Sequence, residues 1–193
     1  VKTPGTLRTL IGEQQKHRVT DLALEGALNG TDLRFLREMA GSDYPMQPTA
    51  GRLRTLDLSR ATFTSGGEAY IFKDESQSIE GGALTLPPFA FRSCRLEQVV
   101  LPERMDTIGI GAFEYSALRS IRIPEQSVVM GWAFNRCDSL VEVEFPQHLV
   151  ELGQNCLREG GNRRRLQVQD VEFLHYHVFE NVTGLEGIII DGT

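Results

Sequence analysis

The sequence predicts a solenoid, in which short coils of chain stack on one another and each coil adds one strand to a parallel β-sheet. Three observations predict this fold class: a unit of about 22 residues recurs, each regular unit ends in an alternating apolar pair followed by proline, and no long helical pattern separates the units. One unit is too short to bury its own apolar face, but stacked units cover each other, with parallel strands about 4.8 Å apart.

The repeated unit is clearest within residues 89–193. The first unit runs from Ala90-Phe91 to Leu101-Pro102, and the same pattern returns 22 positions later, from Ala112-Phe113 to Ile123-Pro124. Three further units begin at Ala133-Phe134, Cys156-Leu157 and Val178-Phe179. The fourth unit is degenerate, and the fifth has Asp191 where the regular units have proline.

The end of each unit predicts a strand. Apolar residues spaced by two, such as Ile121 and Ile123, are typical of a strand with one buried face. The proline that follows ends the strand, because a proline within it would remove a ladder hydrogen bond. Segments such as 105–109 and 149–153 lie between strands, and their apolar residues and glycine predict a second buried wall of irregular chain.

The aromatic residue that opens most units is expected inside the solenoid. The small side chains of Ala90, Ala112 and Ala133 leave room for the neighbouring rings. We therefore predict a stack of aromatic side chains along the interior, made of Phe91, Phe113, Phe134 and Phe179.

Residues 1–60 predict an N-terminal capping region with short helices. Two further strand patterns occupy residues 19–24 and 53–58. Between them, residues 31–41 predict an amphipathic helix with Thr31 as its N-cap and a glycine at its end. Residues 6–16 predict a second helix that closes the open end of the stack.

Residues 61–88 have no clean period. Paired glycines and prolines predict a long loop or an irregular rung there. Together with the cap and the repeats, this stretch is expected to belong to a single domain of 193 residues.

Composition argues against several classes of function. The chain has 20 Lys and Arg residues against 26 Asp and Glu residues, a net charge of −6, whereas binding to nucleic acid requires a basic face. Its apolar runs are far shorter than the roughly 18 to 20 residues that cross a bilayer. No catalytic or phosphate-loop motif is present, so we expect neither an enzyme nor a cofactor.

Cysteines and histidines predict no disulfide and no metal site. Cys94 and Cys137 fall two rungs apart, about 9 to 10 Å, which exceeds the roughly 7 Å limit for a disulfide, so both are expected to stay reduced. His175 and His177 offer two imidazoles, but a zinc site needs three or four ligands. Arg158 and residues 163–165 form a basic spot, which is either an attraction for an anionic glycan or lipid headgroup or a solvated turn.

The outward positions of the predicted strands form the candidate partner-binding face. If the strands stack in sequence order, Arg122 lies beside Glu144 and Glu142 lies beside Arg165. Two interpretations remain open: a solvated face whose charges neutralise each other, and a recognition surface. The candidate residues are Gln98, Val100, Ser120, Arg122, Glu142, Glu144, Arg165 and Gln167.

The unit Ile108-Gly109-x-x-Ala112-Phe113-x-x-Ser116-x-Leu118-x-x-Ile121-x-Ile123-Pro124 resembles the BspA-like class of leucine-rich repeats. The leading part, from Asn29 to Gly41 followed by Leu56-Asp57-Leu58-Ser59, is similar to the amino-terminal region of such proteins from anaerobic gut and oral bacteria. The resemblance implies a leucine-rich-repeat solenoid, a right-handed β/α superhelix with a parallel sheet on one face and few helices.

The resemblance also implies a function. It implies a non-enzymatic protein, secreted or at the cell surface, that mediates binding or adhesion to a protein or glycan partner. Either the face of the solenoid or the loop at residues 60–88 is expected to engage that partner. The alternative is a structural spacer that presents another domain and has no ligand of its own. No family-wide functional residue is carried over. Because the sequence begins with Val1, we expect that an export signal has been removed, and a lipid or other cell-surface anchor upstream stays open.

Overall fold

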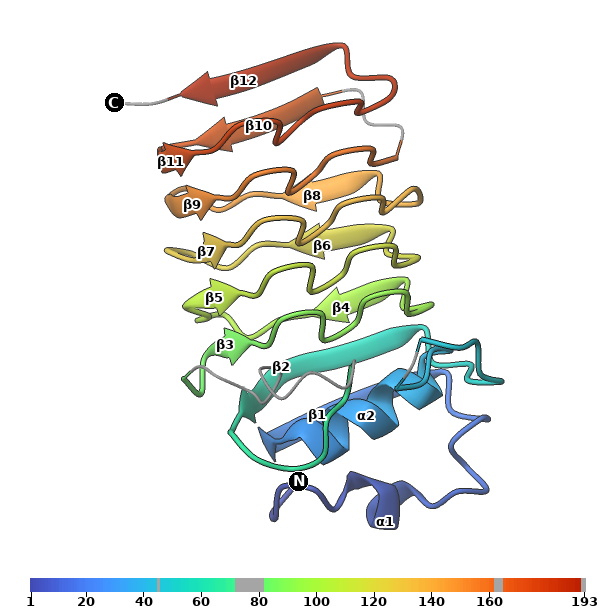
Figure 1. Ribbon diagram of the computed structural model, residues 1–193. Helices are drawn as coiled ribbons and strands as arrows, with labels where there is room; N and C mark the ends of the chain where they lie inside the picture. Colours follow the sequence, from blue (N-terminus) through green and yellow to red (C-terminus); the bar gives the residue numbers. More distant parts are fainter. Residues whose placement is uncertain (45, 72–81, 162–164, 192–193) are drawn as a thin grey trace.

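The chain forms a ladder of stacked coils (Figure 1), as seen in a computed structural model that describes residues 1–44, 46–71, 82–161 and 165–191. The first sheet has five strands in the order β1-β2-β4-β6-β8, and every neighbouring pair is parallel. These strands are β1 (Asp21–Leu28), β2 (Thr55–Phe63), β4 (Gln98–Val100), β6 (Ser120–Arg122) and β8 (Glu142–Glu144). The predicted parallel sheet and solenoid are confirmed.

A second parallel sheet lies along another side of the same coils. Its order is β3-β5-β7-β9-β11, so that the four coils that contain β2, β4, β6 and β8 each contribute one strand to each sheet. The strands are β3 (Thr85–Leu86), β5 (Thr107–Ile108), β7 (Val128–Val129), β9 (Leu149–Leu152) and β11 (Val171–Leu174). The predicted second buried wall is confirmed, but it is a sheet and not irregular chain. Strands of two to four residues are too short to show a period of two in the sequence.

The last two coils add a separate pair of strands. β10 (Arg165–Gln169) pairs in parallel with β12 (Gly187–Asp191) over five residues. Figure 1 shows this pair continuing the column of the first sheet beyond β8. β12 is therefore the final rung of the described ladder.

Corners between the sheets make the third side of each coil. Their main chains bond from rung to rung, as in Phe113 N to Ala133 O at 2.8 Å and Phe134 N to Cys156 O at 2.9 Å. Two positions four residues apart have a positive φ in each of these coils, for example Phe89 at 54° and Ser93 at 58°. Such left-handed residues tighten the corner, so that the chain turns there in a few residues without forming a helix.

The interior is filled by the aromatic side chains predicted from the repeat. The rings of Phe91 and Phe113 stack with centroids 5.8 Å apart, and those of Phe113 and Phe134 with centroids 5.5 Å apart. All three rings are buried. Among the described residues the stacked rings end at Phe134: Leu157 fills the position in the next coil, and Phe179 is only half-buried one coil further on. The predicted stack is thus confirmed for three of its four members.

The N-terminal end of the ladder is covered by helices α1 (Leu7–Ile11) and α2 (Gly30–Met39). The helix predicted over residues 31–41 is present, but its N-cap is Asn29 and not Thr31. The Asn29 side chain accepts hydrogen bonds from the backbone of Thr31 and Asp32, and the Asp32 carboxylate accepts one from the Asn29 backbone at 3.1 Å. The predicted helix over residues 6–16 is only five residues long, and it is followed by turns.

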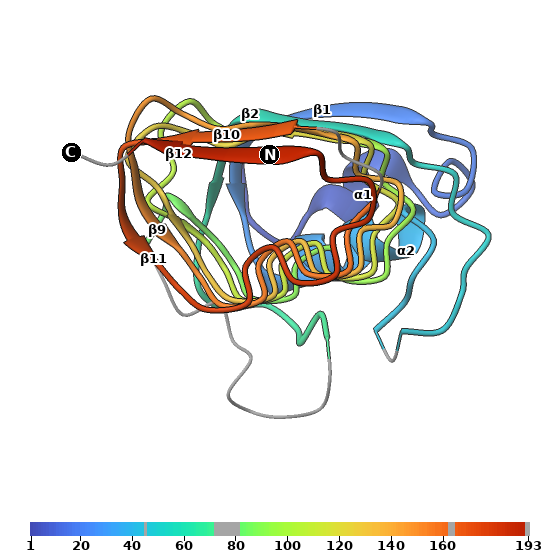
Figure 2. The same cartoon turned by 90° about the horizontal axis from the view of Figure 1, so that it is seen from above.

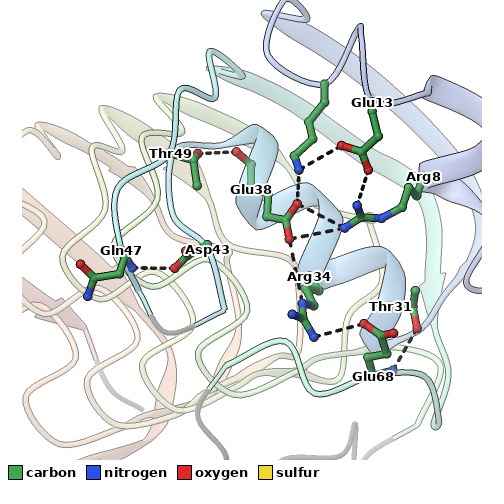
Figure 3. Close-up of polar contacts among 10 residues, drawn as sticks. Arg8, Glu13, Thr31, Arg34, Glu38, Asp43, Gln47, Thr49 and Glu68 are labelled. Carbon is green, nitrogen blue, oxygen red and sulfur yellow. Dashed lines mark hydrogen bonds and ion pairs between the residues drawn. The ribbon is translucent and has the colours of Figure 1, made fainter.

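Charged side chains hold the two helices together. In Figure 3, the Glu38 carboxylate on α2 accepts from Arg8 and from Lys16 and pairs with Arg34, one turn away on the same helix. Arg34 also reaches Glu68 at 3.1 Å. This network gives the end of the ladder the polar outer surface that a terminal repeat needs.

One arginine joins the cap to the repeats from inside. Arg37 on α2 is fully buried and donates to the main-chain oxygens of Phe89 and Ala90 at 3.1 and 3.2 Å, and to the Ser42 hydroxyl at 3.2 Å. None of these partners is a carboxylate, so within the described part of the chain the guanidinium is held by dipoles. No helix within the described ranges is long and apolar enough to cross a membrane.

Candidate functional site

A groove of about 890 Å³ lies along the outer face of the first sheet. Its floor is formed by β4, β6 and β8, and its wall is formed by the segments 101–104, 123–125 and 145–147, which follow these strands. Seen down the stack in Figure 2, the chain after the first-sheet strands arches outward at the upper left before it enters the second sheet. Six of the eight candidate residues predicted from the sequence line this groove: Gln98, Val100, Ser120, Arg122, Glu142 and Glu144.

The repeat itself places these side chains outside. Val99 and Ile121 occupy the middle of three-residue strands and are buried, which turns the residues on both sides of each towards solvent. Val100 is consequently 48% exposed, and it is the large apolar side chain that the floor of the groove leaves exposed. Each strand then stops at proline, and the following residues leave the sheet to build the wall.

Carboxylates outnumber cations in the groove. Four acidic residues line it, Glu103, Glu125, Glu142 and Glu144, against the two arginines Arg104 and Arg122. The predicted cross-strand pair between Arg122 and Glu144 is confirmed, with Nε and Oε1 3.4 Å apart. Both side chains of this pair are well exposed, so the pair is screened by water and contributes little to stability.

Glu125 has a structural role in the wall. Its two carboxylate oxygens accept the backbone N–H groups of Gln147 and His148 at 2.9 and 3.2 Å. It thereby ties one wall segment to the next coil. By contrast, Glu142 and Glu144 occupy outward positions on β8 and line the groove.

The other two candidate residues lie on β10, beyond the groove. Gln167 is exposed on this strand, and the backbone of Arg165 pairs with Gly187. The side chain of Arg165 lies outside the described part of the chain, so its predicted pair with Glu142 stays a prediction. The hydrogen-bonded first sheet ends at β8, so β10 does not extend the ladder that forms the floor of the groove.

The predicted basic spot is only partly described, since residues 162–164 lie outside the described ranges. Its remaining member Arg158 pairs with Glu159 and with Glu180, at 3.0 and 3.1 Å. The charge of Arg158 is therefore compensated by the neighbouring residue and by a carboxylate on the next coil.

Histidines near the end of the ladder pair with carboxylates. His175 lies 2.8 Å from Glu151, and His177 lies 3.0 Å from Glu180. His148 contacts the carboxylates of Asp170 at 2.6 Å and Glu172 at 3.0 Å. The hydrogen bond that the ring donates to the Asp170 carboxylate, with the charges of both carboxylates, raises the pKa of His148 above its ordinary value. No group of three or more potential ligands within the described residues has the geometry of a metal site.

The cysteines belong to the interior. Cys94, Cys137 and Cys156 are buried as thiols. Cys137 Sγ donates to the carbonyl oxygen of Phe113 at 3.0 Å and lies 3.4 Å from the hydroxyl of Ser116. Burial raises the pKa of Cys94, which keeps this thiol protonated and unreactive.

The sequence-based list of candidate residues missed the wall of the groove. Glu103, Glu125 and Gln147 each come directly after the proline that ends a strand. The repeated proline followed by a Glu or Gln was therefore the available signal. It was overlooked because proline was treated only as the end of a strand.

These features define a repeat protein whose coils present a continuous sheet and a groove on its outer face. The model for the BspA type leucine rich repeat region matches residues 72–193 in six copies. The chain therefore belongs to the BspA-type leucine-rich-repeat family, which confirms the resemblance drawn from the repeat unit. This family and its fold are generally non-enzymatic, and its members are generally at the surface of bacteria or secreted by them.

The solved structures that this chain resembles include another repeat protein. The crystal structure of a leucine-rich repeat protein from Bacteroides ovatus is similar with a TM-score of 0.49 and 19% sequence identity. The similarity covers 94% of this chain and 58% of that protein, so this chain spans little more than half its length. No curated protein matches the sequence.

Proposed function

We propose that this chain is a non-enzymatic binding protein, secreted or at the cell surface, whose groove over β4, β6 and β8 holds an extended segment of a protein partner. The observation that carries the proposal is the groove itself, because three successive coils contribute equivalent floor and wall positions to it. A groove repeated in this way suits a partner that runs along the stack.

The lining of the groove favours a protein segment over a glycan. Glycans are often bound by exposed aromatic faces, but Phe145 is the one aromatic residue among those that line this groove. Val100 offers an apolar contact on the floor, and the excess of carboxylates over arginines favours a partner with Lys or Arg side chains. The partner proposed here is therefore a basic, extended polypeptide segment.

One substitution in the groove and a matched one outside it test the proposal. Val100 and Val141 are exposed to similar extents, 48% and 58%, but only Val100 lines the groove. The wild-type chain is screened against extracellular matrix proteins, mucins and bacterial polysaccharides. For any partner that binds, Val100→Lys is expected to weaken the affinity at least about tenfold, because it places a cation on the floor of the groove and removes an apolar contact there. Val141→Lys is expected to leave the affinity unchanged.

The results also separate the alternatives. A protein partner that binds Val100→Lys as tightly as it binds the wild type would refute the groove as the site. Binding to the polysaccharide or to the glycans of mucin alone would replace the protein partner with a glycan. If no matrix protein, mucin or polysaccharide binds the chain, the result would favour the structural spacer.

A further inference from the structure

The outer face of the first sheet is acidic at both ends of the groove and mostly uncharged between them. Ser59 brings β2 into the lining of the groove, and the register places Asp57 of β2 beside Val100 of β4. The outward positions then continue from strand to strand in the same register. From β2 to β8 they are Asp57, then Gln98 and Val100, then Ser120 and Arg122, then Glu142 and Glu144.

Asp57 forms the end of this row that is nearer to the helical cap. Its neighbours Leu56 and Leu58 are buried, so the Asp57 side chain points outward on the face that carries Val100. Its carboxylate accepts the backbone N–H of Ser59 at 2.8 Å. Hydrogen bonds from Ser59 lower the pKa of Asp57, which keeps this group charged at neutral pH. Within the described ranges no cation pairs with it, so its charge is available to a partner.

Glu142 and Glu144 form the opposite end, on β8. Both occupy outward positions and are exposed. Glu144 pairs with Arg122, whereas Glu142 forms no ion pair with any side chain that the structure describes. The described side chains at this end therefore carry two carboxylates against one arginine, and the pair with Arg122 is exposed and exchanges readily.

The distance between the two ends matches four residues of an extended chain. Three steps of about 4.8 Å between parallel strands separate β2 from β8, which gives about 14 Å. An extended segment rises about 3.4 Å per residue, so residues i and i+4 are also about 14 Å apart. The side chains of i, i+2 and i+4 point to the same face of such a segment. Residue i+2 then lies over the middle of the row, where Val100 is exposed.

We propose that the groove selects an extended segment in which basic residues at i and i+4 flank an apolar residue at i+2. This proposal rests on the function proposed above and specifies the sequence pattern of the partner. One basic side chain pairs with Asp57, the other pairs with the carboxylates of Glu142 and Glu144, and the residue at i+2 covers Val100. With a spacing of three or five residues, one of the two basic side chains would point away from the sheet.

The middle of the row disfavours a third basic residue. A lysine at i+2 would lie between Val100, which offers it no polar contact, and the cation of Arg122. Like charges on neighbouring strands repel, and an apolar contact would be lost at the same time. The selectivity of the groove thus comes from attraction at its ends and from repulsion at its centre.

Synthetic peptides of nine residues test the pattern on the full chain by fluorescence anisotropy. The probe has lysine at its third and seventh positions, leucine at its fifth, and threonine or serine elsewhere. Two peptides of the same composition place the lysines three and five residues apart. The probe is expected to bind at least about threefold more tightly than either of them. A peptide with a third lysine in place of the leucine should bind at least about threefold more weakly than the probe.

Substitutions at the two ends of the row assign the charges. Asp57→Asn removes the charge but keeps an oxygen that accepts the Ser59 N–H, and Glu142→Gln removes one charge from the other end. Each substitution should weaken binding of the probe about threefold and reduce its advantage over the other spacings. Asp106→Asn is the matched control, because Asp106 is an exposed carboxylate that precedes β5 and does not line the groove. It should leave the affinity unchanged.

The outcomes distinguish the pattern from the groove itself. Suppose that Val100→Lys weakens binding of a protein partner, but the three spacings bind equally well or no peptide binds up to roughly 1 mM. The groove would then stand as the site, and the pattern would be overturned. Equal affinity of the wild type, Asp57→Asn and Glu142→Gln for the probe would overturn it as well. If Val100→Lys changes neither the binding of the protein partner nor that of the probe, both proposals fail.

Discussion

Replacement of Phe113 by alanine tests the energetic basis of the stacked coils. Phe113 is fully buried, and its ring contacts Phe91 on one side and Phe134 on the other, with centroids 5.8 and 5.5 Å away. Loss of a buried phenyl ring costs about 3 to 5 kcal/mol. Phe113→Ala is expected at the upper end of this range, because each stacked contact contributes about 0.5 to 1.5 kcal/mol beyond area burial and both are lost together.

Urea denaturation followed by circular dichroism measures this loss as the change in the free energy of unfolding. The matched control is Phe173→Ala, which removes the same ring from a position that is mostly exposed and is expected to change stability by less than about 0.5 kcal/mol. A loss below about 1 kcal/mol for Phe113→Ala would refute a continuous interior in which each coil is completed by the next.

Three further predictions concern the cap and one charged cluster. Asn29→Ala should lower the free energy of unfolding by about 1 kcal/mol, and a larger loss on Thr31→Ala would contradict Asn29 as the N-cap of α2. Arg37→Ala should cost at least about 2 kcal/mol in urea denaturation, because it removes the donor of the buried Ala90 carbonyl and one of the two donors of the Phe89 carbonyl; a loss under about 0.5 kcal/mol would show that the cap does not depend on this guanidinium. The pKa of His148, measured by NMR titration, should lie above 6.5, so the stabilisation from the protonated ring is complete below that pH and is lost as the pH rises through the pKa of the folded state. His148→Gln should remove this pH-dependent step, and a folded-state pKa at or below 6.5 would contradict the contacts with Asp170 and Glu172.

The regular positions of the repeat could be predicted from the sequence. The inward and outward residues of β4, β6 and β8 follow from an alternation of two and from the proline at the end of each strand. The pairing of Arg122 with Glu144 follows from the same register, since a fixed period places equivalent residues side by side. In a repeat protein, residues one period apart in the sequence lie side by side on neighbouring rungs. These long-range neighbours can therefore be predicted from the sequence.

The remaining features depend on contacts that do not repeat. The second sheet has strands of two residues in three coils, which leaves too few positions for any periodicity to appear. The N-cap of α2 was placed two residues too late, because Thr31 is itself a good capping residue. Its hydroxyl instead accepts from the backbone of Glu68, a partner 37 positions away that no local pattern indicates.

The ion pairs indicate which groove residues are available to a partner. Glu125 already accepts two backbone N–H groups of the next coil, so a ligand that took this carboxylate would loosen the wall. Among the described residues, the Arg122 and Glu144 side chains form an ion pair only with each other; this pair is exposed, and opening it costs little. Val100 has no polar partner to lose, and its exposed surface gains from being covered. Binding energy is therefore expected to concentrate on Val100 and on the exchangeable pair beside it, while the wall keeps the coils in register.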